Sequence, residues 1–129
     1  MNIYQQELLD HYHHSPYRGI LDDPDFSSDE YNPSCGDKIS FQGNIKENVV
    51  KDIAFNGSGC VISQAVASLL AHKTKNNSID FVDSLDSQSI ITMIGISLGP
   101  TRLKCALLPL HALKQGIKNY CKKQDSCLC

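Results

Sequence analysis

Two side chains that could bind a metal lie two positions apart in the segment NPSCGD, where Cys35 and Asp37 flank Gly36. In a helix, side chains with this spacing face away from each other around the axis. In an extended segment they lie on the same face, and Gly36 allows backbone conformations that a chiral residue resists. A thiol and a carboxylate could therefore reach one ion from this segment.

Two further thiols lie where helices are expected to start. Cys60 follows a turn of sequence GSG and directly precedes an apolar helical pattern. The N–H groups and the dipole of a helix N-terminus favour a negative charge there. Cys105 lies near the start of the last expected helix, beside the cationic Arg102 and Lys104. Both thiols are thus placed at element ends, where functional side chains concentrate.

With the pair in NPSCGD, these thiols make a set of three sulfur donors and one carboxylate. Zn²⁺ accepts thiolates and a carboxylate together, and iron–sulfur clusters are held chiefly by thiolates. The oxygen donor is harder than sulfur and easier to displace, which suits a protein that passes its cargo on. The wide spacing of the cysteines matches no zinc-finger pattern. The residues alone therefore leave open a shared metal site, three unrelated thiols, and an Asp37 that only caps a turn.

The composition is that of one globular domain of 129 residues, with 41 % hydrophobic and 20 % charged residues. A net charge of −2 indicates no general attraction to nucleic acid or to an anionic membrane. The first residues carry acids and no apolar signal region, and no apolar run is long enough to span a membrane. We expect a cytoplasmic protein, whose six cysteines indicate metal binding, catalysis or burial rather than a disulfide framework.

Local patterns predict the elements that position these residues. NIYQQELLDHYHH is typical of a helix, and the acidic, turn-rich LDDPDFSSDE indicates a solvated connector. The alternating runs KISFQGNI and NVVKDIAF predict an antiparallel hairpin.

Helices are predicted for the rest of the chain. VISQAVASLLAHKTK carries apolar residues at helical spacing, and SIDFVDSLDSQSIITMIGI suggests one or two shorter helices. RLKCALLPLHALKQGIKNYCKK predicts a final helix, in which Pro109 would be a kink or a new first turn. The order of helix, strands and helices indicates the α+β class.

The motifs NPSCGD, FNGSGCVISQA and RLKCALLPLHAL resemble, in order and spacing, the three cysteine motifs of the U-type iron–sulfur assembly scaffolds (SufU, IscU and the N-terminal domain of NifU). The opening LLDHYHHSPYRGIL is similar to the first segment of that family. The resemblance extends over residues 4 to 118, and the combination of motifs is highly specific.

The resemblance implies a single α+β domain over residues 1–129, with a small antiparallel sheet packed against helices. It implies that Cys35, Asp37, Cys60 and Cys105 meet at one exposed end and hold zinc or a transient [2Fe-2S] cluster. It also implies a scaffold or sulfur acceptor rather than an enzyme. The expected partners are a cysteine desulfurase and downstream proteins that accept the cluster.

Two departures from the family patterns bear on the branch. IscU-type members have a histidine directly before the third cysteine, whereas Lys104 stands there, as in SufU-type members. SufU-type members carry an insertion before the third motif, and the chain is too short for it. The sequence therefore leaves open which branch of the family the chain resembles, and with it whether the chain is a scaffold or a sulfur relay. We expect Cys105 to be the sulfur acceptor, because Arg102 and Lys104 would favour its anion.

The remaining candidates have plainer interpretations. Residues 119–129 are expected to be a flexible tail, with Cys121, Cys127 and Cys129 as thiols without a function. The histidines of HYHH are expected on the surface, and His72 and His111 on helix faces. Two other functions are weighed: a structural zinc module that never exchanges its metal, and a thiol redox enzyme, which the absence of a Cys-x-x-Cys motif disfavours.

Overall fold

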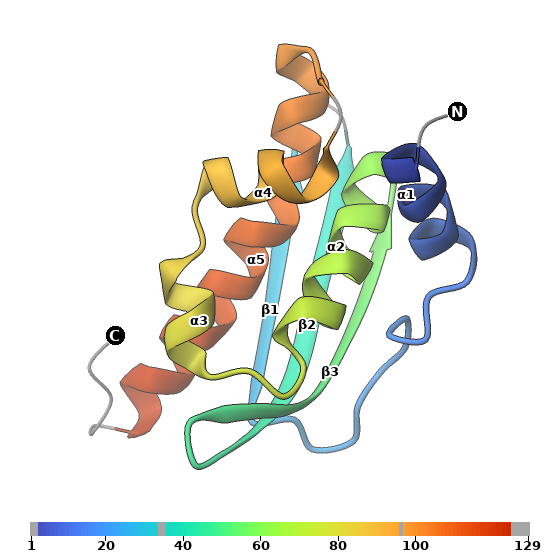
Figure 1. Cartoon of the computed structure of the whole chain (residues 1–129). Coiled ribbons are helices and arrows are strands. Elements are labelled where there is room, and N and C mark those ends of the chain that lie inside the picture. The colour runs from blue at the N-terminus through green and yellow to red at the C-terminus, as the bar shows by residue number, and fades with distance from the viewer. Residues whose placement is uncertain (1–2, 34–35, 96, 125–129) are drawn as a thin grey trace.

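A computed structural model describes residues 3–33, 36–95 and 97–124. Helices α2 and α5 cover one face of a three-stranded sheet, and α1 packs beside α2 (Figure 1). The fold is α+β, as predicted. The elements are, in order, α1 (Ile3–His13), β1 (Phe26–Asn32), β2 (Asp37–Lys46), β3 (Val49–Ser58), α2 (Val61–Thr74), α3 (Ile79–Ser84), α4 (Ser87–Ile94) and α5 (Pro100–Gln124).

The predicted hairpin is confirmed by β2 and β3, which pair antiparallel with β2 in the centre of the sheet. Glu47 and Asn48 form the two-residue turn, both with positive φ, as hairpin turns that match strand twist require. Inward side chains such as Ile39 and Phe41 are fully buried. The hairpin thus supplies the rigid floor of the core, and its first residue is Asp37.

The prediction of a connector at LDDPDFSSDE is wrong for its second half, because Phe26–Asn32 forms the edge strand β1. Phe26 is 3 % exposed and faces α5, while Ser27 and Asp29 point to solvent. An edge strand with one open face accepts small polar residues, so its sequence carries little strand signal. Pairing with β2, a tertiary contact, decides its conformation.

Helix α2 follows the predicted apolar pattern and is buried over most of its length. Two short helices follow, as anticipated: α3 begins at the N-cap Ser78, and α4 begins at Asp86 in a capping box with Ser89. Helix α4 ends at Gly95 in a left-handed conformation. These helices build the layer that lies beside α5 (Figure 1).

Helix α5 is one helix of 25 residues with Pro109 inside it, so Pro109 does not start a new helix. The helix continues to Gln124, and the first part of the expected tail is therefore helical. Cys121 is 4 % exposed and belongs to the core cluster, so the prediction of a flexible thiol is wrong for it. Cys127 and Cys129 lie outside the described residues. Among the described helices, none combines the length and the apolar character that crossing a membrane requires.

Candidate metal centre

Asp37 is the first residue of β2 and pairs with Asn32 at the end of β1. The N–H of Gly36 donates a 2.8 Å hydrogen bond to the carbonyl of Asn32, and Gly36 has φ +79°. In the part of the chain that the structure describes, no atom lies within 4 Å of a Cβ placed at Gly36, so it is the positive φ that favours glycine there. The Asp37 side chain is 1 % exposed.

Cys60 is the N-cap residue of α2. Its Sγ accepts a 3.4 Å hydrogen bond from the N–H of Ile62, and its carbonyl accepts one of 3.0 Å from Oγ of Ser63. A thiol thus occupies the position that a serine or aspartate oxygen usually fills at a helix start. The helix fixes the place of the sulfur at its N-terminus, as the sequence predicted.

The carboxylate and the Cys60 loop are joined directly. The N–H of Cys60 donates a 2.7 Å hydrogen bond to Oδ1 of Asp37. Gly59 has φ +106°, and a Cβ at that position would clash with the same oxygen. The buried Gln64 holds the loop from the helix side, because its Nε2 donates a 3.1 Å hydrogen bond to the carbonyl of Gly59.

Cys105 comes from the second turn of α5 and meets this pair. One donor atom from each of Asp37, Cys60 and Cys105 lies within 4.8 Å of the other two. Donors bound to a tetrahedral zinc at about 2.3 Å lie about 3.8 Å apart, so small side-chain rotations would bring the three onto one ion. Two sulfurs and one oxygen are donors that zinc accepts, and a deeply buried carboxylate is expected to be paired or to bind a metal. The donor set therefore fits a metal.

The fourth predicted donor, Cys35, lies outside the described residues. Cys105 is 3 % exposed, whereas Cys60 is half-buried. Arg102 and Lys104 are exposed, so solvent screens their charges and their effect on Cys105 stays a prediction.

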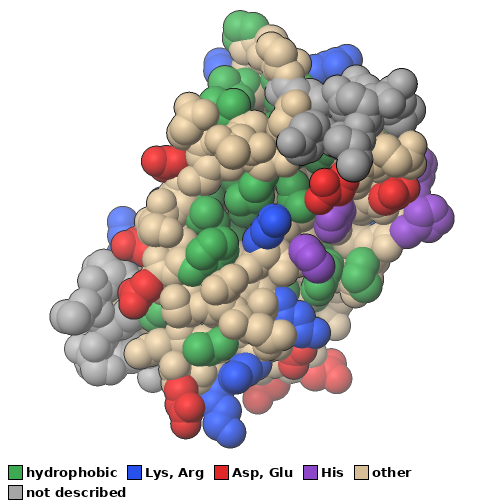
Figure 2. Space-filling view, viewed as in Figure 1, with side chains coloured by type: hydrophobic (Ala, Val, Ile, Leu, Met, Phe, Trp, Pro, Cys, Tyr) green, Lys and Arg blue, Asp and Glu red, His purple; other side chains and the backbone are tan. Residues whose placement is uncertain are grey.

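The histidines are not all on the surface. His13 and His14 are exposed, as predicted, and histidine side chains gather over α1 and α2 (Figure 2). His11 is half-buried, and its Nδ1 shares a 2.8 Å hydrogen bond with Oγ of the buried Ser68. Burial lowers the pKa of His11, and the positive charge of His72 lowers it further. These residues lie outside the three-donor cluster.

Sequence reasoning missed the positioning residues of the centre. Gln64 stands one helical turn after Cys60, and Gly59 stands directly before it. For Gln64, the local signal in the sequence is a polar residue four positions after the cysteine that precedes the predicted helix. The steric role of Gly59 depends on Asp37, which is far away in sequence and near only in the fold.

The sequence model of one protein family, the NifU-like N-terminal domain, matches residues 3–127 of this chain. The zinc-dependent sulfurtransferase SufU of Bacillus subtilis (strain 168) is 33 % identical, with 89 % of this chain and 89 % of the relative covered. The iron–sulfur cluster assembly scaffold protein IscU of Thermotoga maritima is 32 % identical, with 90 % and 93 % covered.

Solved structures show the same fold. The N-terminal part of a nitrogen-fixing NifU-like protein from Brucella abortus matches with a TM-score of 0.76 at 20 % identity, over 94 % of this chain and 96 % of that one. A putative scaffold protein for the SUF system from Fervidobacterium islandicum matches with a TM-score of 0.74 at 20 % identity, over 87 % and 94 %. The chain belongs to the NifU-like N-terminal domain family, with SufU and IscU among its relatives.

Proposed function

We propose that this protein works in iron–sulfur cluster assembly and holds a metal ion or a growing cluster on Asp37, Cys60 and Cys105, with Cys35 as the fourth ligand. The observation that carries the proposal is the meeting of a carboxylate and two thiols from three separate elements within 4.8 Å. Residues so far apart in sequence are brought together at a cost in chain entropy. A shared ligand gives that arrangement a use.

Zinc is the resident metal in this proposal. When bound, it would keep the thiols deprotonated and protect them from oxidation. The chain's own residues give the site its asymmetry. Asp37 accepts a hydrogen bond from the N–H of Cys60 at Oδ1, so the carboxylate that would bind the metal is also tied to the loop that carries Cys60. A carboxylate is also easier to displace from the metal than a thiolate is.

In the sulfur-relay version, a cysteine desulfurase presents a persulfide. A thiolate of this protein attacks the outer sulfur, so that a new S–S bond forms as the old one breaks. The electron pair of the old bond leaves with the thiolate of the desulfurase, and no outside oxidant or reductant is needed. Cys105 is the proposed acceptor. Because its side chain is 3 % exposed, acceptance requires the second turn of α5 to open when the partner docks.

In the scaffold version, iron and sulfide are the cargo. A [2Fe-2S] cluster would be built on the cysteines, with Asp37 completing the ligand set and limiting how tightly the product is held. Downstream proteins would then take the cluster. The similar identities to a sulfurtransferase and to a scaffold protein support both versions.

One experiment separates the versions from a structural zinc module. The protein is purified without oxygen, its zinc and iron are measured, and a cysteine desulfurase, cysteine and iron are added. Visible charge-transfer absorption supports the scaffold. Faster desulfurase turnover without colour supports the relay. Tightly bound zinc with neither response contradicts the proposal in favour of the structural module.

Two cysteine variants test the assignment of the acceptor. Cys105→Ser should abolish labelling of this protein by persulfide sulfur, and Cys60→Ser should retain it. Cys105→Ser that accepts sulfur at the original rate would show that the acceptor is another thiol. Metal content is measured in both variants, because each removes one proposed ligand.

A further inference from the structure

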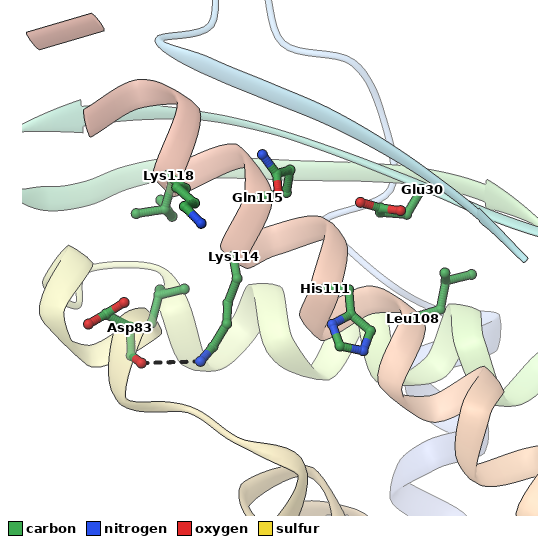
Figure 3. Close-up of a pocket in the computed structure, with 9 residues that line it drawn as sticks. Glu30, Asp83, Leu108, His111, Lys114, Gln115 and Lys118 are labelled. Carbon is green, nitrogen blue, oxygen red and sulfur yellow. Dashed lines mark hydrogen bonds between the residues drawn. The ribbon is translucent and has the colours of Figure 1, made fainter. Parts of the chain in front are cut away.

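A pocket of about 590 Å³ lies over the outer side of α5, between α3 and the edge strand β1 (Figure 3). None of the three clustered donors lines it. Its near end is Leu108, one helical turn after Cys105, and its far end is Lys118. The pocket is therefore a feature separate from the metal centre, although the same helix carries both.

The floor of the pocket is apolar and rigid. Val82 of α3 and Leu108 and Ile117 of α5 contribute to it, and all three side chains are at most 7 % exposed. Buried floor residues cannot move away without opening the core. The volume is within the range of small-molecule sites, which combine an apolar base with a few polar groups.

The rim carries charges of both signs. Lys114 and Lys118 come from α5, Glu30 from β1 and Asp83 from α3. Nζ of Lys114 donates a 3.1 Å hydrogen bond to the backbone carbonyl of Asp83, which holds this ammonium at the edge of the pocket. Two of its three N–H groups stay available for a ligand. Figure 3 shows Glu30 on one side of α5 and the two lysines farther along it.

A ligand with a single charge would gain from one part of this rim and be repelled by another. A molecule that carries an ammonium and a carboxylate can satisfy both parts. His111 and Gln115 add an imidazole and an amide between the charged groups, which can donate or accept further hydrogen bonds. The charge pattern thus selects for a zwitterion, and the floor selects for an aliphatic side chain.

We propose that this pocket binds a small zwitterion of the amino-acid class. The ammonium of the ligand lies near Glu30, its carboxylate lies near Lys114 and Lys118, and its aliphatic part rests on Leu108 and Ile117. The inference does not depend on the function proposed for the metal centre, because it uses none of the donor residues.

The test uses L-leucine as the probe, with two matched comparators. 4-Methylpentanoate lacks the ammonium, and 3-methylbutylamine lacks the carboxylate. None of the three carries a thiol, so none competes for the clustered cysteines. Binding to the purified protein is followed by backbone amide shifts in two-dimensional NMR spectra. Saturable shifts are expected in β1, α3 and α5 around the pocket, with leucine at least about tenfold tighter than either comparator.

Substitutions of the exposed Lys118 and the half-buried Glu30 locate the site. Lys118→Ala and Glu30→Gln should each weaken leucine binding by about fivefold or more, since each removes one charged contact. Lys122→Ala is the matched control, because Lys122 is also exposed on α5 but does not line the pocket. Three results would overturn the proposal: no saturation by about 10 mM leucine, equal affinity for a comparator, or an equal loss in the control variant.

Discussion

The 2.7 Å hydrogen bond from the N–H of Cys60 to Oδ1 of Asp37 gives one carboxylate two tasks. The Asp37 carboxylate fixes the loop that carries Cys60, and it is also one of the three donors in the cluster. Structural support and metal binding at Asp37 can be separated, because an asparagine keeps the acceptor oxygen but loses the charge.

Asp37→Asn should fold with nearly unchanged stability and hold zinc more weakly, by about 10- to 100-fold. Asp37→Ala should lose metal affinity as well and also lower the free energy of unfolding by about 1–3 kcal/mol, because the hydrogen bond to Cys60 disappears. Metal affinity is measured by competition with a chromophoric chelator, and stability by urea unfolding. Release of an assembled cluster should nevertheless be slower in Asp37→Ala, because the remaining thiolate ligands are harder for an acceptor to displace than the carboxylate.

The control for these variants is Asp52→Ala, which removes an exposed carboxylate on β3. It should change neither zinc affinity nor stability. If Asp37→Ala matched this control in metal affinity and cluster release, Asp37 would not belong to the site.

Gly59→Ala should damage the centre without removing a donor. The added methyl group would clash with Oδ1 of Asp37, and φ of +106° disfavours any L side chain. We expect a loss of about 1–3 kcal/mol in the free energy of unfolding together with lower zinc occupancy. Urea unfolding and metal analysis of the purified protein measure the two effects.

Gly99→Ala provides the comparison, because no atom of the described residues lies within 4 Å of a Cβ placed there. Its stability should stay within about 0.5 kcal/mol of the parent protein. Equal zinc occupancy in Gly59→Ala and Gly99→Ala would show that the loop adapts without moving the carboxylate.

Elements that bury one face in a regular pattern could be predicted from the sequence. Ile39 and Phe41 alternate in β2 and are fully buried; Val66 and Leu70 repeat at helical spacing in α2 and are likewise buried. In each case the periodicity that packing requires is written in the local sequence. The strand β1 could not be predicted in this way, because Ser27, Ser28 and Asp29 take their conformation from pairing with β2.

The candidate site shows the same division. The spacing in NPSCGD predicts that Cys35 and Asp37 share a face, which stays a prediction because Cys35 lies outside the described residues. The family resemblance predicted that Cys60 and Cys105 lie near Asp37, and the donor atoms of these three residues do lie within 4.8 Å of one another. The burial of Cys105 and the hydrogen bond between His11 and Ser68 depend on how α5 and α1 dock. No short-range pattern encodes docking, so these features emerge only in the fold.

Pro109 should weaken the part of α5 that carries Cys105. A proline has no N–H, so it cannot donate the helical hydrogen bond to the carbonyl four residues earlier, which is that of Cys105. Pro109→Ala should therefore raise the free energy of unfolding by about 1 kcal/mol, since the restored bond outweighs the greater freedom of the unfolded chain. It should also slow amide exchange in the first turns of α5 and slow sulfur transfer to Cys105.

Amide hydrogen exchange, measured residue by residue, distinguishes a local effect on α5 from a general stabilisation of the protein. Amides of α2 should exchange as before under conditions that report local opening. Unchanged exchange in residues 103–108 of Pro109→Ala would show that the proline does not loosen this segment.

Acid should weaken the contact between α1 and α2 through His11. Burial lowers the pKa of His11 from 6.5, the nearby His72 lowers it further, and Glu7 and Asp10 raise it in part. As the pH falls, His11 takes up its proton in the unfolded chain before it does so in the folded protein. The stability that the neutral ring gives the folded protein is therefore fully present above pH 6.5 and is lost as the pH falls toward the lower pKa of the folded state. Urea unfolding at a series of pH values should show a smaller loss for His11→Gln than for the parent protein. His13→Gln, which alters an exposed histidine on the same helix, should keep the parent slope; equal slopes in all three proteins would remove His11 as the source of the acid sensitivity.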